Sequence, residues 1–191
     1  VFTSNKLCAA PVTVTKQHLD AGQSRLNGIV INSGNANAAT GDLGYKNAIL
    51  MCETAANVIG VENSRIGVCS TGWIGYQLPI DDICHSIPLV IEGSTVDGGD
   101  IASRAIMTTD TKEKTFFKEY KDGNGVQFCV GAIAKGAAML QPNMATMLAF
   151  ITTDASVMRE VLQQSLSRAA QQSFNKLTVD GAQSTNDTVL L

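Results

Sequence analysis

Short apolar runs that end in glycine or asparagine alternate along this chain with longer segments of helical periodicity. Two such runs, Ile29–Ile31 before "NSGNAN" and the run that ends at Thr71-Gly72 in "RIGVCSTGWIG", are typical of buried strands. Between them, the apolar residues of Tyr45–Ile59 recur at helical spacing and predict a helix. Strands that alternate with helices indicate a mixed α/β protein, in which sheets are flanked by helices.

The clearest local pattern is a hairpin in "TFFKEYKDGNGVQFCVGAIAKG". Asp122–Gly125 supply the turn, and the return strand alternates apolar residues and is expected to end near Lys135. Pro79, followed by two aspartates, predicts the start of another helix. Further along, we expect a strand over "MATMLAFITT", a helix from about Val157 to Phe174, and short strands in "LTVD" and "DTVLL".

Composition and charge exclude several classes of protein. The 191 residues carry a net charge of −3 with both signs interspersed, so neither a nucleic acid nor a membrane is an expected partner. Five scattered cysteines without a CxxC spacing, and only two histidines, indicate neither a disulfide framework nor a metal site, and no cofactor is expected. Cys69 and Cys129 lie in apolar strands without a histidine nearby in the sequence, which favours structural thiols over nucleophiles.

A threonine stands in the middle of the apolar run "NMATMLAF", just after a Pro142-Asn143 turn signal. A threonine hydroxyl becomes an effective nucleophile at a chain N-terminus, because its own α-amine, with a pKa of about 7.7–8.0, accepts the proton. Attack of the Thr146 hydroxyl on the Ala145 carbonyl, followed by hydrolysis of the resulting ester, would create that terminus. The alternative is an ordinary β-branched residue in a strand.

Two turns at strand ends carry polar groups. In "STGWIG", the Thr71 hydroxyl and the Gly72 N–H are suited to stabilising an oxyanion, although a plain strand-to-loop turn has the same sequence. In "NSGNANAATG", successive N–H groups form either an anion-binding nest or a tight turn with side-chain caps, and the turn is favoured.

Two other stretches have a functional and a structural interpretation. The hydroxyls of "IMTTDTKEK" either hold the polar end of a substrate or form a turn or helix cap. Lys135 stands among small residues in "AIAKGAAM". It is either solvated at its tip, as lysines usually are, or held in a pocket where it pairs a substrate carboxylate or tunes a neighbouring amine.

Together these stretches resemble the ornithine acetyltransferase family, also called the bifunctional glutamate N-acetyltransferase family of arginine biosynthesis. The resemblance runs almost end to end through "VFTSNKLCAAPV", "VINSGNANAATG", "CSTGWIG", "RAIMTTDT", "AKGAAMLQPNMATMLAFITTD", "SFNKLTVDG" and "STNDTVLL". It implies two stacked β layers with helices outside, as in self-processing N-terminal-nucleophile enzymes. Trp73, Ala138 and Ala182-Gln183 depart from residues that are frequent in the family.

The resemblance also implies that the chain cuts itself between Ala145 and Thr146. Residues 1–145 would then form the first chain, and residues 146–191 would begin the second. The implied roles are Thr146 as acetyl-carrying nucleophile, Thr71 and Gly72 as the oxyanion hole, and Thr108, Lys135 and Thr146 as substrate-binding residues.

The implied reaction moves an acetyl group from N-acetylornithine to glutamate through an acetyl-threonine, and some family members also use acetyl-coenzyme A. The implied partners are these small molecules and the cleaved second chain, within an oligomer of cleaved pairs. The implied location is the cytoplasm, or an organelle matrix if a missing N-terminus carries a transit peptide. The chain has no initiator Met and ends in an apparent strand, so we expect an incomplete piece.

Two other functions fit the residues. A related self-processed threonine hydrolase, such as an aminopeptidase or amidase, would use water as the final acceptor. A non-catalytic α/β domain would never cut itself.

Overall fold

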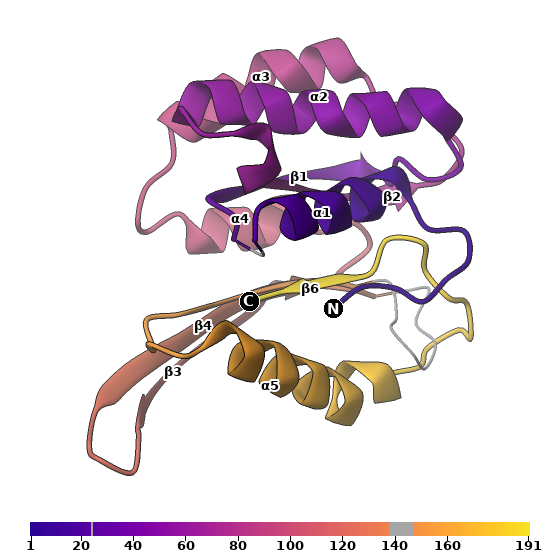
Figure 1. Ribbon diagram of the computed structural model, residues 1–191. Helices are drawn as coiled ribbons and strands as arrows, with labels where there is room; N and C mark the ends of the chain where they lie inside the picture. The colour runs from indigo at the N-terminus through magenta and orange to yellow at the C-terminus, as the bar shows by residue number, and fades with distance from the viewer. Residues whose placement is uncertain (24, 138–146) are drawn as a thin grey trace. The chain divides into compact units, whose positions relative to one another are not determined.

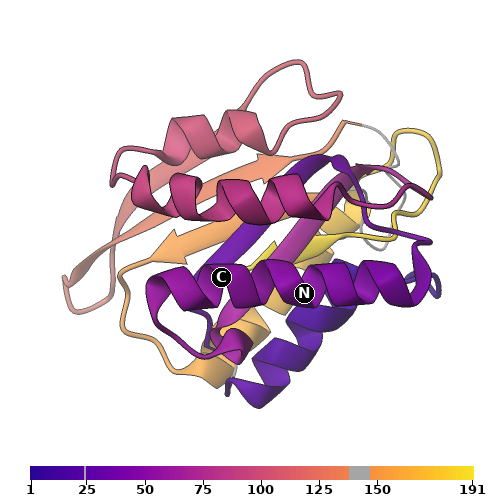
Figure 2. The same ribbon diagram turned by 90° about the horizontal axis from the view of Figure 1, so that it is seen from above.

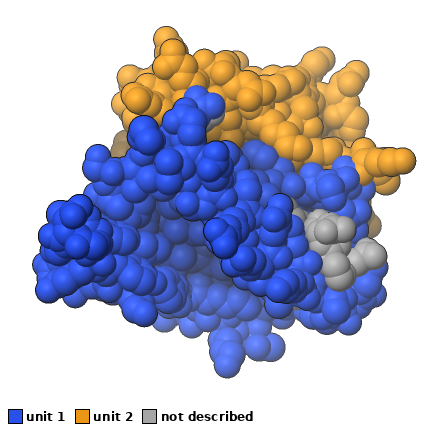
Figure 3. All heavy atoms as spheres, turned by 60° about the horizontal axis from the view of Figure 1, so that its bottom comes forward, with its two compact units in different colours: residues 1–5, 99–191 blue, residues 6–98 orange. Residues whose placement is uncertain are grey.

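The computed structural model describes residues 1–23, 25–137 and 147–191. These residues form two compact units, one made of residues 6–98 and the other of residues 1–5 with 99–191 (Figure 3). Each unit combines a sheet with helices, so the predicted mixed α/β class is confirmed.

The unit of residues 6–98 is built around two parallel strands. Strand β1 pairs with β2 in a register that runs from Gly28 opposite Ile66 to Gly34 opposite Gly72. Because both strands run the same way, their carboxyl ends meet at one edge of the sheet. In chain order its elements are α1 (Ala10–Ala21), β1 (Gly28–Asn35), α2 (Gly41–Ile59), the 3-10 turn η1 (Asn63–Arg65), β2 (Ile66–Trp73) and α3 (Ile80–Glu92).

Helix α2 confirms the predicted helix and begins four residues earlier, at Gly41. It ends at Ile59 and is followed by Gly60, whose φ of 76° is the left-handed cap that glycine adopts without strain. Its apolar face forms the core of this unit with β2 and α3, and Figure 2 shows α2 and α3 lying side by side. The buried residues of α2 include Ala48, Met51, Cys52, Ala55 and Ala56.

Helix α1, which the sequence analysis does not predict, covers the open edge of β2. The buried Thr15 hydroxyl donates to the Val68 carbonyl at 2.7 Å and accepts from the Val68 N–H at 2.8 Å. One turn further along α1, His18 Nδ1 lies 2.7 Å from the Ile66 carbonyl oxygen. Side chains of α1 thus occupy positions where a third strand would otherwise pair.

The other unit contains a mixed four-stranded sheet with the order β3-β4-β5-β6. Strands β3, β4 and β5 are antiparallel neighbours, whereas β6 is parallel to β5. Helix α5 runs along one face of this sheet (Figure 1). The elements are α4 (Gly99–Ala105), β3 (Lys114–Lys121), β4 (Gln127–Lys135), β5 (Leu148–Thr153), α5 (Arg159–Gln172), the 3-10 turn η2 (Phe174–Lys176) and β6 (Thr188–Leu190).

The β3–β4 hairpin confirms the prediction from "KDGNG". Asp122 Oδ1 accepts the N–H groups of Asn124 and Val126, each at 2.8 Å, and Gly125 takes a φ of 84°. The return strand β4 ends at Lys135, as predicted.

Three further elements differ from the sequence predictions. "LTVD" is not a strand, because the chain there passes from η2 into an irregular loop. Helix α5 spans Arg159–Gln172 rather than Val157–Phe174. Strand β5 begins at Leu148, and the predicted strand residues 144–146 lie outside the described residues.

Candidate functional site

Lys135 and Thr108 meet in the unit that contains the four-stranded sheet. Lys135 is the last residue of β4 and is only 3% exposed. Its ammonium donates to Thr108 Oγ1 at 2.7 Å. The solvated interpretation of Lys135 is therefore wrong, and two of the three predicted substrate-binding residues are in contact.

Asp110, two residues after Thr108, organises this cluster, although no sequence pattern predicts a role for it. Its enclosed carboxylate accepts from Lys114 Nζ at 2.6 Å and from the Gly136 N–H at 2.7 Å. It also accepts from the Thr108 N–H at 3.3 Å and lies 3.8 Å from Lys135 Nζ. Burial raises the pKa of Asp110, but these hydrogen bonds and the Lys135 charge outweigh burial and hold it below its ordinary value.

Burial and the neighbouring charges shift the pKa of Lys135 in opposite directions. Burial lowers its pKa most, the Asp110 charge raises it, Lys114 lowers it and Asp187 raises it, with a net lowering. A buried lysine with a depressed pKa binds a carboxylate readily, because little solvation remains to be lost on binding.

Asp187 is a second carboxylate that the sequence analysis did not select. It is 0% exposed and lies just before β6. Its Oδ1 accepts the Met147 N–H at 2.9 Å, whereas Oδ2 has no hydrogen-bond partner among the described residues. Burial raises the pKa of Asp187 to about 7, although bonds from Met147 and Ser184 and the Lys135 charge act in the opposite direction.

Thr71 and Gly72, the predicted oxyanion pair, lie at the carboxyl end of β2 in the unit of residues 6–98. Thr71 is 2% exposed. Gly72 has a φ of 135°, and a Cβ atom there would lie 2.2 Å from the Gly34 carbonyl carbon. Close packing on β1 therefore requires glycine at this position, whatever its N–H does in a reaction.

The asparagine-rich loop after β1 is a turn held by its own side chains. Asn35 Oδ1 accepts the Asn37 N–H at 2.8 Å, and Asn37 Nδ2 donates to the Gly44 carbonyl at 2.8 Å. Thr40 Oγ1 donates to Asn37 Oδ1 at 2.7 Å. These bonds confirm the favoured interpretation of a capped turn.

Ala145 and Thr146, the predicted cleavage pair, lie outside the described residues, as does Ala138. Met147 and Gly136 are described on either side, and both donate their N–H to buried carboxylates. The structure thus brings Thr108 and Lys135 together, and the roles of Thr71, Gly72 and Thr146 stay predictions. Trp73, which departs from the family pattern, is 71% exposed and packs edge-on against Tyr76.

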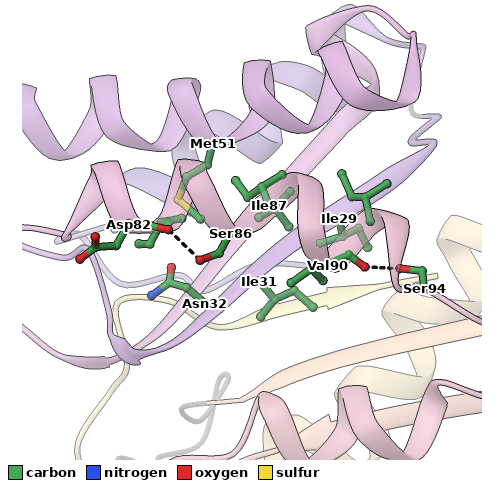
Figure 4. Close-up of a pocket in the computed structure, with 12 residues that line it drawn as sticks. Ile29, Ile31, Asn32, Met51, Asp82, Ser86, Ile87, Val90 and Ser94 are labelled. Atoms are coloured by element: carbon green, nitrogen blue, oxygen red, sulfur yellow. Dashed lines mark hydrogen bonds between the residues drawn. The ribbon is translucent and has the colours of Figure 1, made fainter.

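A pocket of about 380 Å³ lies between β1 and α3 (Figure 4). Its Ser86 hydroxyl donates to the Asp82 carbonyl within α3, and the hydroxyl of Ser94, two residues after α3, donates to the Val90 carbonyl, each at 2.8 Å. The pocket is mostly apolar and contains none of the predicted site residues. Its lining is Ile29, Val30, Ile31, Asn32, Met51, Asp82, Ile83, Ser86, Ile87, Val90, Ile91 and Ser94.

Across residues 1–23, 25–137 and 147–191, every helix is too short or too polar to cross a membrane. Within the same described part of the chain, His, Cys, Asp and Glu side chains form no cluster that would hold a metal ion.

Comparison with known proteins places these features in a family. The family model described as the ArgJ family matches residues 1–191. The arginine biosynthesis bifunctional protein ArgJ of Methylococcus capsulatus is 47% identical over 191 residues, which are 100% of this chain and 46% of that protein. The corresponding protein of Bifidobacterium longum is 46% identical over 193 residues, covering 100% of this chain and 48% of its own length. This chain therefore spans about half the length of the curated relatives it matches.

Two solved structures of ArgJ and ornithine acetyltransferase proteins are also similar to this chain. The crystal structure of the arginine biosynthesis bifunctional protein ArgJ from Bacillus halodurans has a TM-score of 0.68 and 34% identity, covering 77% of this chain and 74% of that chain. Ornithine acetyltransferase from Mycobacterium tuberculosis, crystallised with ornithine, has a TM-score of 0.66 and 35% identity, covering 77% and 75%. The family resemblance read from the sequence is confirmed: this chain belongs to the ArgJ family.

Proposed function

We propose that this chain provides part of an acetyltransferase of arginine biosynthesis, which moves an acetyl group from N-acetylornithine to glutamate. The match to the ArgJ family over residues 1–191 supports the pathway, and the ornithine-bound relative supports the substrate class. The observation that carries the proposal is the buried Lys135 held by Thr108, because a desolvated ammonium beside a hydroxyl suits the α-carboxylate that both substrates share.

The first step of the proposed chemistry is self-cleavage. The Thr146 hydroxyl attacks the Ala145 carbonyl, a C–O bond forms as the C–N bond breaks, and the Thr146 nitrogen takes up the proton. Water then hydrolyses the ester and leaves residues 1–145 and a second chain that begins at Thr146. Donors from the Thr71 hydroxyl and the Gly72 N–H would stabilise the negative charge on the carbonyl oxygen.

Acetyl transfer repeats this chemistry on a substrate. The Thr146 hydroxyl, with its α-amine as base, takes the acetyl group of N-acetylornithine and releases ornithine with the proton on its amine. The amine of glutamate then attacks the acetyl ester, restores the hydroxyl and leaves as N-acetylglutamate. Acetyl-coenzyme A as a second donor, and an oligomer of cleaved pairs, are further parts of this proposal.

Self-cleavage and acetyl transfer are tested together on the complete gene product. Intact mass and N-terminal sequencing should find a second chain that starts at Thr146, and Thr146→Ala should stay in one piece. N-acetylornithine without an acceptor should then add one acetyl group to the Thr146 peptide, and glutamate should remove it. An acetyl group lost to water at the same rate with and without glutamate would instead identify a threonine hydrolase.

Two variants test the assigned roles. Thr71→Val should slow cleavage and transfer by about 100-fold to 1,000-fold, because an oxyanion donor contributes about 2.7–4 kcal/mol. Lys135→Ala should mainly raise the KM for N-acetylornithine, with Lys121→Ala, an exposed lysine at the end of β3, as the matched control. Equal KM values for the two lysine variants would remove Lys135 from the substrate site.

A further inference from the structure

Three strand ends lie in register at one edge of the four-stranded sheet. Lys135 of β4 pairs with Leu148 of β5, and Leu148 pairs with Thr188 of β6. The next residues beyond this edge are Gly136, Met147 and Asp187. Two of these three, Gly136 and Met147, enclose the segment of the chain that includes Ala145 and Thr146.

Each of these two residues gives its N–H to a buried carboxylate from a distant part of the chain. Gly136 donates to Asp110 Oδ1 at 2.7 Å, and Met147 donates to Asp187 Oδ1 at 2.9 Å. The Asp110 side chain and Asp187 are both 0% exposed. Hydrogen bonds to an ionised acceptor are shorter and stronger than neutral ones. The pKa of Asp110 is held below its ordinary value, so its bond to Gly136 has this added strength, whereas the bond from Met147 gains it as pH rises above the Asp187 pKa of about 7.

The Met147 N–H belongs to the peptide bond that follows Thr146, so Asp187 acts on the backbone directly after the proposed nucleophile. The carbonyl of Met147 is held as well, because it accepts the Thr188 N–H at 3.0 Å. The loop that carries Asp187 is itself fixed. The Asp187 carbonyl accepts the Thr3 N–H at 2.8 Å, and the Ser184 hydroxyl bonds to the Asp187 carboxylate.

Strand pairing alone does not explain a carboxylate at position 187. An asparagine would accept the same N–H without placing a charge in the interior, and a buried polar atom without a partner costs stability. Asp187 Oδ2 is such an atom among the described residues. The Lys135 ammonium lies 3.8 Å from Asp110, and its charge also lowers the pKa of Asp187 against the effect of burial.

We propose that Asp187 is a positioning residue for the reaction at Thr146, because it fixes the backbone N–H that directly follows Thr146. This inference rests on the proposed function. Of the two carboxylates, Asp110 is the one that lies 3.8 Å from the Lys135 ammonium, the proposed substrate-binding group.

The test uses the complete gene product and compares Asp187→Asn and Asp187→Ala with the wild type. The matched control is Asp122→Asn, because Asp122 also accepts backbone N–H groups but lies at the tip of the β3–β4 hairpin. Rates of self-cleavage and of acetylation at Thr146 are measured per folded molecule, with folding checked by circular dichroism.

A small displacement of reacting groups costs about 100-fold in rate, so Asp187→Ala should slow both steps by about that factor. Asp187→Asn should slow them by about tenfold, since the acceptor remains and the charge does not. The KM for N-acetylornithine should stay within about twofold in Asp187→Asn, whereas Asp122→Asn should change neither step. In the wild type, rates should fall as Asp187 takes up its proton, and this part of the pH profile should vanish in Asp187→Asn.

A second measurement does not depend on activity. In the uncleaved Thr146→Ala protein, the Met147 amide proton should shift with pH as Asp187 titrates, and Asp187→Asn should abolish the shift. The nearby charges that also titrate or respond, Lys135, Asp110 and Lys114, remain in both proteins. The inference would be overturned if Asp187→Asn kept wild-type rates of cleavage and transfer, or if the chemical shift of the Met147 amide proton did not change with pH. A wild type that is never cut before Thr146 would instead overturn the proposed function.

Discussion

Replacing Thr15 by valine tests how the edge of β2, the strand that carries Thr71 and Gly72, is stabilised. The Thr15 hydroxyl makes two hydrogen bonds to Val68, at 2.7 and 2.8 Å, and Thr15 is 0% exposed. Valine has almost the same shape, so the substitution removes the two bonds and leaves the packing in place. The Val68 N–H and C=O then lose their partner in the interior, and each such group costs about 1–3 kcal/mol. We therefore expect a loss of about 2–6 kcal/mol in the free energy of unfolding.

The assay combines denaturant unfolding of the uncleaved Thr146→Ala protein with hydrogen exchange of the Val68 amide. Thr15→Val should lower the denaturation midpoint and speed exchange at Val68. The control is Thr54→Val, which removes an exposed bond from Thr54 Oγ1 to the Leu50 carbonyl and should change stability by less than about 0.5 kcal/mol. If Thr15→Val matched this control in both measurements, helix α1 would not be what protects the edge of β2.

Three further outcomes are expected. Gly72→Ala should cost several kcal/mol and reduce the yield of folded protein, because the new Cβ atom would lie 2.2 Å from the Gly34 backbone, and thermal unfolding measures the loss. Burial raises the pKa of Asp187 from 3.8 to about 7, so the folded state binds a proton more tightly and stability should fall as pH rises from about 4 to 7. The stability difference between wild type and Asp187→Asn should therefore change by at most about 4 kcal/mol over that window, and a difference independent of pH would contradict this. Lys114→Met should raise the pKa of Asp110, followed by carboxyl-carbon NMR, because Asp110 loses the hydrogen bond that lowers its pKa most.

Local patterns in the sequence predicted much of the fold. Helix α2 and the β3–β4 hairpin follow from periodicity and turn residues that act over a few positions. Helix α1 escaped prediction because its start, "PVTVT", is rich in β-branched residues that do not favour a helix. Its stability depends on contacts with β2, such as that of Thr15 with Val68, 53 residues away.

The candidate site was predictable in part. The family resemblance led to Thr108 and Lys135, but periodicity gave no reason to expect Lys135 to be buried, because burial depends on Asp110 and on the strands around it. Asp187 was present in the quoted motif "STNDTVLL" but was not selected. An acid directly before an apolar strand was a usable signal, since aspartate is seldom fully buried without a partner.

The order of the strands in the four-stranded sheet has a consequence for unfolding and refolding. If the chain is cut before Thr146, β5 and β6 belong to the second chain, while β4 on one side and residues 1–3 on the other belong to the first. The new subunit boundary would cross the sheet twice, through the β4–β5 ladder and through the pairing of Phe2 with Thr188. Unfolding that is unimolecular before the cut would then release two chains, and refolding would depend on protein concentration. If cleavage occurs as proposed, the sheet would have to form first, because the cut turns strand pairing within one chain into strand pairing between two chains.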